Sequence, residues 1–155
     1  MTEAPPNYRE ARFEEAPTLA AFQLALALET EGLELDADAC GRGVRAVFDD
    51  PAKGCWYVAT VGREISASLL VTPEWSDWFD GPIWWIQSVY VLPGRRGRKL
   101  FTGFYGFIKA LATLDPSVRG LRLYVDKRNL AAKKAYAALG MNGEHYELFE
   151  WMKTP

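Results

Sequence analysis

The chain has 155 residues, of which 49% are hydrophobic and 25% are charged, and its 6 Trp, 7 Tyr and 8 Phe exclude a disordered polymer. This length corresponds to one domain with a single core, so we expect one domain over residues 1–155. The formal net charge of −2 disfavours general attraction to nucleic acid.

Membrane and metal functions are also disfavoured by the sequence. The longest mostly apolar segment, Leu19–Leu28, is about half the roughly 20 residues that a membrane helix needs. Residues 1–12 have neither the apolar core of a secretion signal nor a basic amphipathic pattern. Cys40 and Cys55 lie far apart and form no Cys-x-x-Cys pair. We therefore expect a cytoplasmic protein with no membrane partner, no disulfide framework and no metal.

Apolar periodicity predicts the elements. In chain order these are a strand over 7–13, helices over 19–31 and 36–48, a strand hairpin over 55–61 and 64–72, a central strand over 82–92, a helix over 100–112, a strand over 120–125, a helix over 130–139 and a last strand over 145–152. Gly41 and Gly43 weaken the second helix by roughly 1 kcal/mol each relative to Ala. The order predicts an α/β fold of three layers, with a central mixed sheet of six to seven strands flanked by about four helices.

Four basic residues, Arg95, Arg96, Arg98 and Lys99, lie between the central strand and the helix that follows it. The rest of the chain has a larger acidic excess, so positive charge is concentrated at this turn. A glycine-containing turn that becomes a helix aims unpaired N–H groups and a positive dipole end at one spot, which favours phosphate. The loop matches neither GxxxxGK[ST] nor GxGxxG, which disfavours ATP and NAD.

Two blocks resemble the GNAT superfamily of acetyl-CoA-dependent N-acetyltransferases. The segment "RGRKLF", Arg96–Phe101, follows "VYVLP" and occupies the register of the family's pyrophosphate loop, [QR]-x-x-G-x-[GA]. It departs from that pattern at Lys99, where Gly is usual, and at Phe101, where Gly or Ala is usual. The segment "NLAAKKAYAALGM", Asn129–Met141, resembles the family's N-x-x-A-x-x-x-Y-x-x-x-G-[FM] helix at a matching distance. The resemblance spans roughly residues 8–152.

The resemblance implies acetyl-CoA as co-substrate and a sheet splayed between its fourth and fifth strands. The pantetheine arm would pair with the backbone of Val89, Tyr90 and Val91. The implied pyrophosphate site comprises Arg96, Gly97, Arg98, Lys99, Leu100 and Phe101. Asn129 is a further candidate for contact with CoA, although a helix cap is the favoured interpretation of this residue.

Tyr136 matches the family's proton donor to the departing thiolate. Its reference pKa near 10 is close to that of a thiol, about 8.5. Its alternative role is to continue the apolar stripe of its helix. The N–H of Val89 is the expected donor to the tetrahedral oxyanion.

The general base has no matching residue, because the strand over 83–91 contains no carboxylate and Trp85 fills the comparable position. Glu29 and Glu74, with Asp77 beside the latter, are candidates if burial raises their pKa. A solvated surface acid is the alternative for each of them. Gln87 is able to order a water but not to act as a base.

The predicted activity is transfer of an acetyl group from acetyl-CoA to a primary amine by direct attack in a ternary complex. The acidic stretches over 29–38 and 74–80, the second of which is rich in aromatics, favour a small cationic amine or a peptide amino group as acceptor; solvated loops are the alternative. Two other functions stay open: a non-catalytic acyl-CoA-binding module, and a nucleic-acid module that stacks bases on Trp, which the net charge opposes. A homodimer is left open as well.

Overall fold

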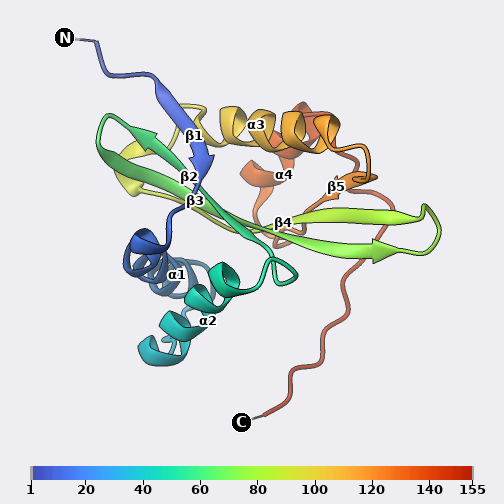
Figure 1. Ribbon diagram of the computed structural model, residues 1–155, viewed down its shortest axis with the longest axis horizontal. Coiled ribbons are helices and arrows are strands. Elements are labelled where there is room, and N and C mark those ends of the chain that lie inside the picture. Colours follow the sequence, from blue (N-terminus) through green and yellow to red (C-terminus); the bar gives the residue numbers. More distant parts are fainter. Residues whose placement is uncertain (1, 155) are drawn as a thin grey trace. The chain divides into compact units, whose positions relative to one another are not determined.

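The structure, a computed structural model, describes residues 2–154, which form two compact units that are described separately (Figure 1). The first unit, Met1–Arg122, contains β1 (Pro6–Glu10), η1 (Phe13–Glu15), α1 (Ala16–Glu31), α2 (Ala37–Asp49), β2 (Cys55–Val61), β3 (Glu64–Ser76), β4 (Gly81–Val91), η2 (Pro93–Arg95), α3 (Leu100–Leu114) and β5 (Gly120–Arg122). The second unit, Leu123–Pro155, contains α4 (Leu130–Ala138).

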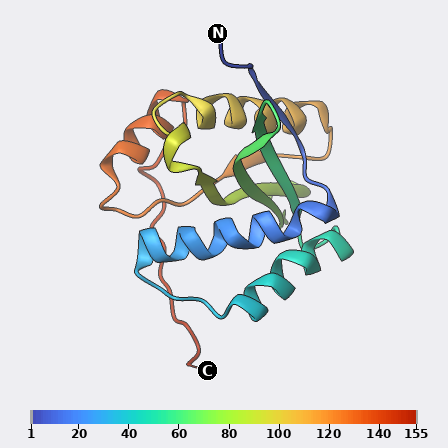
Figure 2. The same cartoon turned by 90° about the vertical axis from the view of Figure 1, so that its left-hand side faces the viewer.

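The first unit is a three-layer α/β structure. Its sheet has the order β1-β2-β3-β4-β5, with antiparallel pairing except between the parallel strands β4 and β5. Helices α1 and α2 cover one face of this sheet, and α3 covers the other (Figure 2). The predicted fold class is therefore confirmed. None of the helices within residues 2–154 is long and apolar enough to cross a membrane.

The strand count was predicted wrongly, because the sheet has five strands within residues 2–154 and not six to seven. The expected last strand over 145–152 belongs to no helix or strand. Its alternating apolar residues fit the pattern of a strand, but a strand also needs a partner for its backbone hydrogen bonds. The strand expected over 120–125 is also shorter, since β5 ends at Arg122.

The helix boundaries follow the local signals in the sequence. Pro17 lies in the first turn of α1, and Gly32 ends that helix in the left-handed conformation with φ of 61°. The carboxylate of Asp36 caps α2 by accepting a hydrogen bond of 2.8 Å from the N–H of Ala39. These caps fix the lengths of the two helices that pack against the sheet.

An irregularity in β4 reshapes the middle of the sheet. Ser68 of β3 lies opposite Tyr90, but Leu70 lies opposite Gln87, so β4 carries one extra residue between these pairs. Ser88 at this bulge has φ of 56°, a left-handed conformation that is rare for residues other than glycine. Such bulges re-aim the backbone groups beside them.

The other edge of β4 is only partly paired. Strand β5 pairs with β4 at Ile83, Trp84 and Trp85, and the pairing ends there. Within residues 2–154, no strand pairs with this edge of β4 after Trp85. The second half of β4 thus leaves its backbone groups at an open edge, beside the bulge.

Replacing Gly43 with alanine is expected to stabilise the protein. Gly43 lies on the exposed side of α2, and an added Cβ would meet no atom within 4 Å. The change should raise the free energy of unfolding by about 1 kcal/mol, measured by urea denaturation. Gly32→Ala is the matched control of opposite sign, because an alanine there must adopt a positive φ. Equal effects of the two changes would contradict this account.

Candidate active site

The loop from β4 to α3 keeps the backbone shape of a glycine-rich turn despite its bulky residues. Gly97 has φ of 75°, and Lys99, the N-cap residue of α3, has φ of 58°. Lys99 stands where the family pattern has glycine, and it adopts the left-handed conformation that favours glycine. This departure from the motif therefore changes the side chain without changing the path of the chain.

The first turn of α3 is suited to an anion. Lys99 gives this turn no side-chain cap, so its N–H groups are not used by a capping side chain. The turn is also held in place, since the hydroxyl of Tyr8 donates a hydrogen bond of 3.1 Å to the carbonyl of Leu100. The ring of Tyr8 packs against Phe104 one turn later, with centroids 5.4 Å apart. A fixed helix N-terminus of this kind binds phosphate.

The arginines of this loop already have carboxylate partners. One carboxylate, that of Glu3, bridges Arg95 and Arg98, and its Oε2 lies 2.8 Å from Nη1 of Arg98. Arg95 also donates to Glu64 over 2.5 Å. An incoming phosphate would thus compete with Glu3 for the two arginines. Sequence reasoning missed Glu3 and Glu64, because an exposed acid carries no local signal of a distant partner.

Arg96 connects the end of α1 to the end of β4. Its guanidinium donates two hydrogen bonds, of 2.8 and 3.0 Å, to the carboxylate of Glu29. Its Nε donates to the carbonyl of Val91 over 2.9 Å, and its Cζ lies 5.6 Å from the centre of the Tyr90 ring. The side chain of Arg96 thus contacts one of the carbonyls expected to pair with pantetheine.

Glu29 does not have the raised pKa that a general base in this site would need. It is a candidate base only if burial raises its pKa, but the side chain is 40% exposed, and hydrogen bonds from Arg96 lower the pKa of this carboxyl. The condition for a base at this position is not met, because Glu29 pairs with Arg96, which lies 67 positions away in the sequence. In the paired state Glu29 is a weak base.

Tyr90 anchors the bulge of β4 to α1. Its ring is 6% exposed and lies 5.0 Å from the ring of Phe22, centre to centre. Ser68, opposite Tyr90, is fully buried, and within residues 2–154 its Oγ has no hydrogen-bond partner. The bulge, which includes Val89, therefore lies beside buried residues of the sheet.

Glu74 lies far along the sheet from the bulge that includes Val89. It pairs opposite Ile83, which is six residues before Val89, or about 20 Å along a strand. Its two oxygens accept hydrogen bonds of 3.0 Å from Trp85 and from Arg122. Glu74 thus ties β3, β4 and β5 together. Asp77 belongs to the turn beyond, further still along the hairpin.

The exposed aromatic residues of the β3–β4 hairpin lie far from the bulge. Trp75 and Trp78 are 65% and 82% exposed. They lie at the end of the β3–β4 hairpin that is opposite to the bulge along β4. Trp75 and Trp78 therefore lie far from Val89 along β4, as Glu74 does.

The second unit carries the other block of the motif. The side chain of Asn129 caps α4 by accepting a hydrogen bond of 3.1 Å from the N–H of Ala132, so the predicted cap is confirmed. Gly140, with φ of 86°, follows the end of the helix. Tyr136 lies on α4, and burial raises the pKa of its phenol. It is therefore protonated at neutral pH, as a proton donor must be.

Comparisons with solved structures identify the fold. The crystal structure of a possible acetyltransferase from Clostridium difficile 630 is 40% identical, with a TM-score of 0.88 over 97% of this chain and 99% of that chain. A predicted acetyltransferase from Clostridium acetobutylicum, solved with acetyl-CoA, is 18% identical, with a TM-score of 0.72 over 97% of this chain and 96% of that chain. Ribosomal-protein-alanine N-acetyltransferase from Brucella melitensis biovar Abortus 2308 is 12% identical, with a TM-score of 0.76 over 96% of this chain and 100% of that chain.

The last two similarities, at low identity, concern the fold alone. A search of curated proteins found no match. The sequence profile of the acetyltransferase (GNAT) family matches residues 18–141, which include both the basic loop and α4. This chain is therefore a member of the GNAT acetyltransferase family.

Proposed function

We propose that the protein is an N-acetyltransferase that moves an acetyl group from acetyl-CoA to a primary amine by direct attack, acting in the cytoplasm. The observation that carries the proposal is the uncapped first turn of α3 next to the open, bulged edge of β4. The N–H groups of Arg96–Phe101 bind the pyrophosphate, and the backbone of Val89–Val91 pairs with the pantetheine amides.

The chemistry needs an oxyanion donor, a proton donor and a base. The amine nitrogen attacks the thioester carbon, and the N–H of Val89 stabilises the oxyanion. Collapse of the tetrahedral intermediate breaks the C–S bond, and Tyr136 gives its proton to the leaving thiolate. The ion pair of Glu29 and the position of Glu74 disfavour both acids as the base. A water near Gln87 is our candidate; the amide of Gln87 is itself held by a 2.7 Å hydrogen bond to Thr72.

Release of free thiol from acetyl-CoA across a panel of amines tests this function. Amine-dependent release with saturation kinetics is the expected result. Saturable binding of acetyl-CoA without release for any amine would instead support a non-catalytic acyl-CoA-binding module. Absence of acetyl-CoA binding would overturn the assignment of the loop as well.

Removing the carboxylate of Glu3 should strengthen the binding of CoA. In Glu3→Gln, Arg95 and Arg98 lose the anion that competes with phosphate, so calorimetry at low salt should show about a 2- to 5-fold lower Kd. Lys99→Glu keeps a non-glycine residue at the same backbone position but reverses its charge, and it should raise Kd by at least about 5-fold. Glu14→Gln, outside the loop, is the control. A higher Kd for Glu3→Gln would mean that Glu3 orders the loop rather than competing for it.

We further propose a cationic acceptor, recognised by the acidic connection between α1 and α2. Asp36 serves there as a helix cap and Glu29 pairs with Arg96, which leaves Glu31, Glu34 and Asp38 to attract a cation. Acetylation should be faster for polyamines and basic peptides than for acidic amino acids, and the preference should shrink at high salt.

Glu31→Gln combined with Glu34→Gln should reduce the rate with polyamines while sparing a neutral amine. This pair leaves the Glu29–Arg96 contact intact, so the double variant changes charge without freeing an arginine. A preference for acidic acceptors, or a rate with polyamines that is indifferent to this variant, would contradict the proposed acceptor.

A further inference from the structure

A cavity of about 340 Å³ lies where β1 ends beside the start of β2. Four aromatic residues, Phe48, Trp56, Tyr57 and Trp84, are among those that line it. Trp84 lies five residues before Val89 on β4, or about 17 Å along the strand. The cavity is therefore separate from the bulge at which acetyl transfer is proposed, and the proposed function leaves it without a role.

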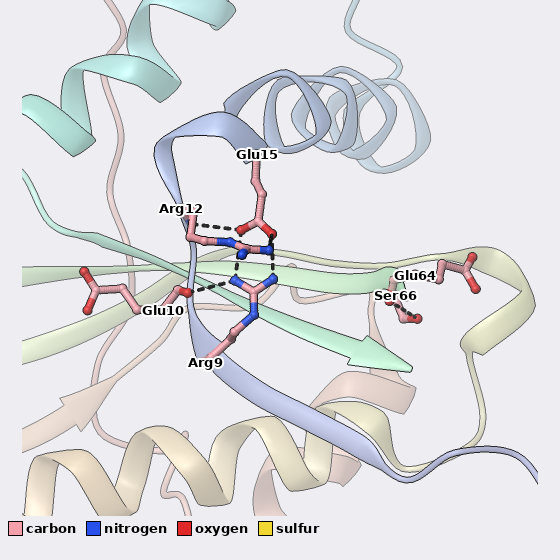
Figure 3. Close-up of polar contacts among 6 residues, drawn as sticks. All are labelled: Arg9, Glu10, Arg12, Glu15, Glu64 and Ser66. Atoms are coloured by element: carbon pink, nitrogen blue, oxygen red, sulfur yellow. Dashed lines mark hydrogen bonds and ion pairs between the residues drawn. The ribbon is translucent and has the colours of Figure 1, made fainter. Parts of the chain in front are cut away.

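Of the described residues that line this cavity, Glu10 is the one that carries a charge. Its neighbour Arg9 is engaged elsewhere, since it donates hydrogen bonds of 3.0 and 2.5 Å to the carboxylate of Glu15. Figure 3 shows Arg9 and Arg12 converging on Glu15, while the carboxylate of Glu10 points away from them. Hydrogen bonds from Arg9 lower the pKa of Glu15 to about 2, so this pairing persists at neutral pH. The negative charge of Glu10 is thus not balanced by the nearest arginines.

The other polar groups of the cavity are neutral. Cys55 and Tyr57 lie two residues apart on β2, and Tyr57 pairs opposite Glu10. Burial raises the pKa of the Cys55 thiol to about 11, and burial together with its neighbours raises the pKa of Tyr57 as well. Both groups therefore stay protonated at pH 7, and the charge of the cavity lining is that of Glu10 alone.

The indole of Trp56 offers no free hydrogen-bond donor to the cavity. The indole N–H of Trp56 is used within the core, where it donates to the carbonyl of Val44 over 3.2 Å. Trp56 is also 4% exposed, so its ring belongs mainly to the core and contributes little to the cavity. A carboxylate beside aromatic faces attracts a cation through ion pairing and through the ring quadrupoles together. An anion would be repelled, and a sugar would find few donors.

We propose that this cavity is a second ligand site, which binds a small organic cation with an apolar body. The ammonium group lies against Glu10, and the apolar part lies against Phe48 and Trp84. The volume is at the lower end of the range for ligand pockets, which fits a molecule of about one ring. The proposal does not rest on acetyl transfer, because it needs neither the basic loop nor Tyr136.

Benzyltrimethylammonium is a suitable probe, because a quaternary nitrogen has no N–H and is not acetylated. Calorimetry should show saturable binding, and NMR should show shifts at the indole of Trp84 that persist with saturating CoA. Glu10→Gln should weaken this binding at least about 5-fold. Benzyl alcohol, a neutral probe, should bind Glu10→Gln and the parent protein equally. Glu14→Gln, which removes an acid outside the cavity, should behave like the parent.

Trp84→Leu should weaken both probes, because it removes an aromatic wall. Thermal melts of each variant establish that the variant is folded before its binding is compared. The proposal is overturned if the probe does not saturate, if Glu10→Gln binds it as well as the parent does, or if the shifts lie around Val89 and disappear with CoA.

Discussion

Replacing Tyr136 with phenylalanine is expected to lower the turnover number about 100-fold while leaving the Kd for acetyl-CoA nearly unchanged. The change keeps the ring in its half-buried position on α4 and deletes only the hydroxyl. The thiolate then leaves without a positioned proton donor. Steady-state kinetics together with calorimetry on the same preparation separates this loss of chemistry from a loss of binding.

The pH profile gives a second readout for Tyr136. Because burial raises the pKa of this phenol above its ordinary value of 10.0, the donor is protonated below that pH and is lost only as the pH rises beyond it. An alkaline limb above pH 10 should therefore be present in the parent protein and absent in Tyr136→Phe. Tyr124→Phe, in the same unit but outside α4, is the control. Equal turnover of parent and Tyr136→Phe would leave Tyr136 with a packing role only.

Helix ends were predicted well from the sequence, because a cap or helix-ending residue acts on the backbone within a few residues of itself. Pro17, Gly32 and Asp36 bound α1 and α2 as their chemistry requires, and Asn129 caps α4. Such signals depend on backbone conformations and hydrogen bonds within about four residues. They could therefore be interpreted from the sequence alone.

Features that depend on distant partners could not be predicted. The apolar alternation over 145–152 indicated a strand, but strand formation is decided by a neighbour rather than by the segment itself. The pairs of Arg96 with Glu29 and of Arg98 with Glu3 join residues 67 and 95 positions apart. Those partners decide the charge that the basic loop presents, so its sequence overstated the positive potential available to a phosphate.

At two positions of the site, Ser88 and Lys99, the residue type did not predict the backbone conformation. Lys99 departs from the glycine of the family pattern, yet its φ of 58° reproduces the turn that glycine favours. The bulge at Ser88 had no signal, because no glycine or proline lies between Ile83 and Val91 of this apolar strand. Both positions hold non-glycine residues in the left-handed region, which costs about 1 kcal/mol each. That cost is tolerated beside the expected cofactor site, a common location for backbone strain.

Gly54→Ala is expected to destabilise the protein by about 3 kcal/mol, which lowers Tm by roughly 6–12 °C for a chain of this size. Gly54 is buried just before β2 and has φ of 139°, a conformation that side chains other than glycine rarely adopt. An added Cβ would lie 2.5 Å from the carbonyl oxygen of Val71. Val71 pairs opposite Cys55, so relief of this clash must disturb the first pair of the β2–β3 ladder.

Gly62→Ala separates the two causes of the lost stability, which are the positive φ and the clash with Val71. Gly62 has a positive φ of 60°, but an added Cβ there would meet no atom within 4 Å. Alanine at this position carries the conformational penalty alone, about 1 kcal/mol, so the difference between the variants measures the clash with Val71. Urea denaturation of both variants gives the two free energies. A loss for Gly54→Ala no larger than that for Gly62→Ala would mean that the start of β2 shifts away from Val71 at little cost.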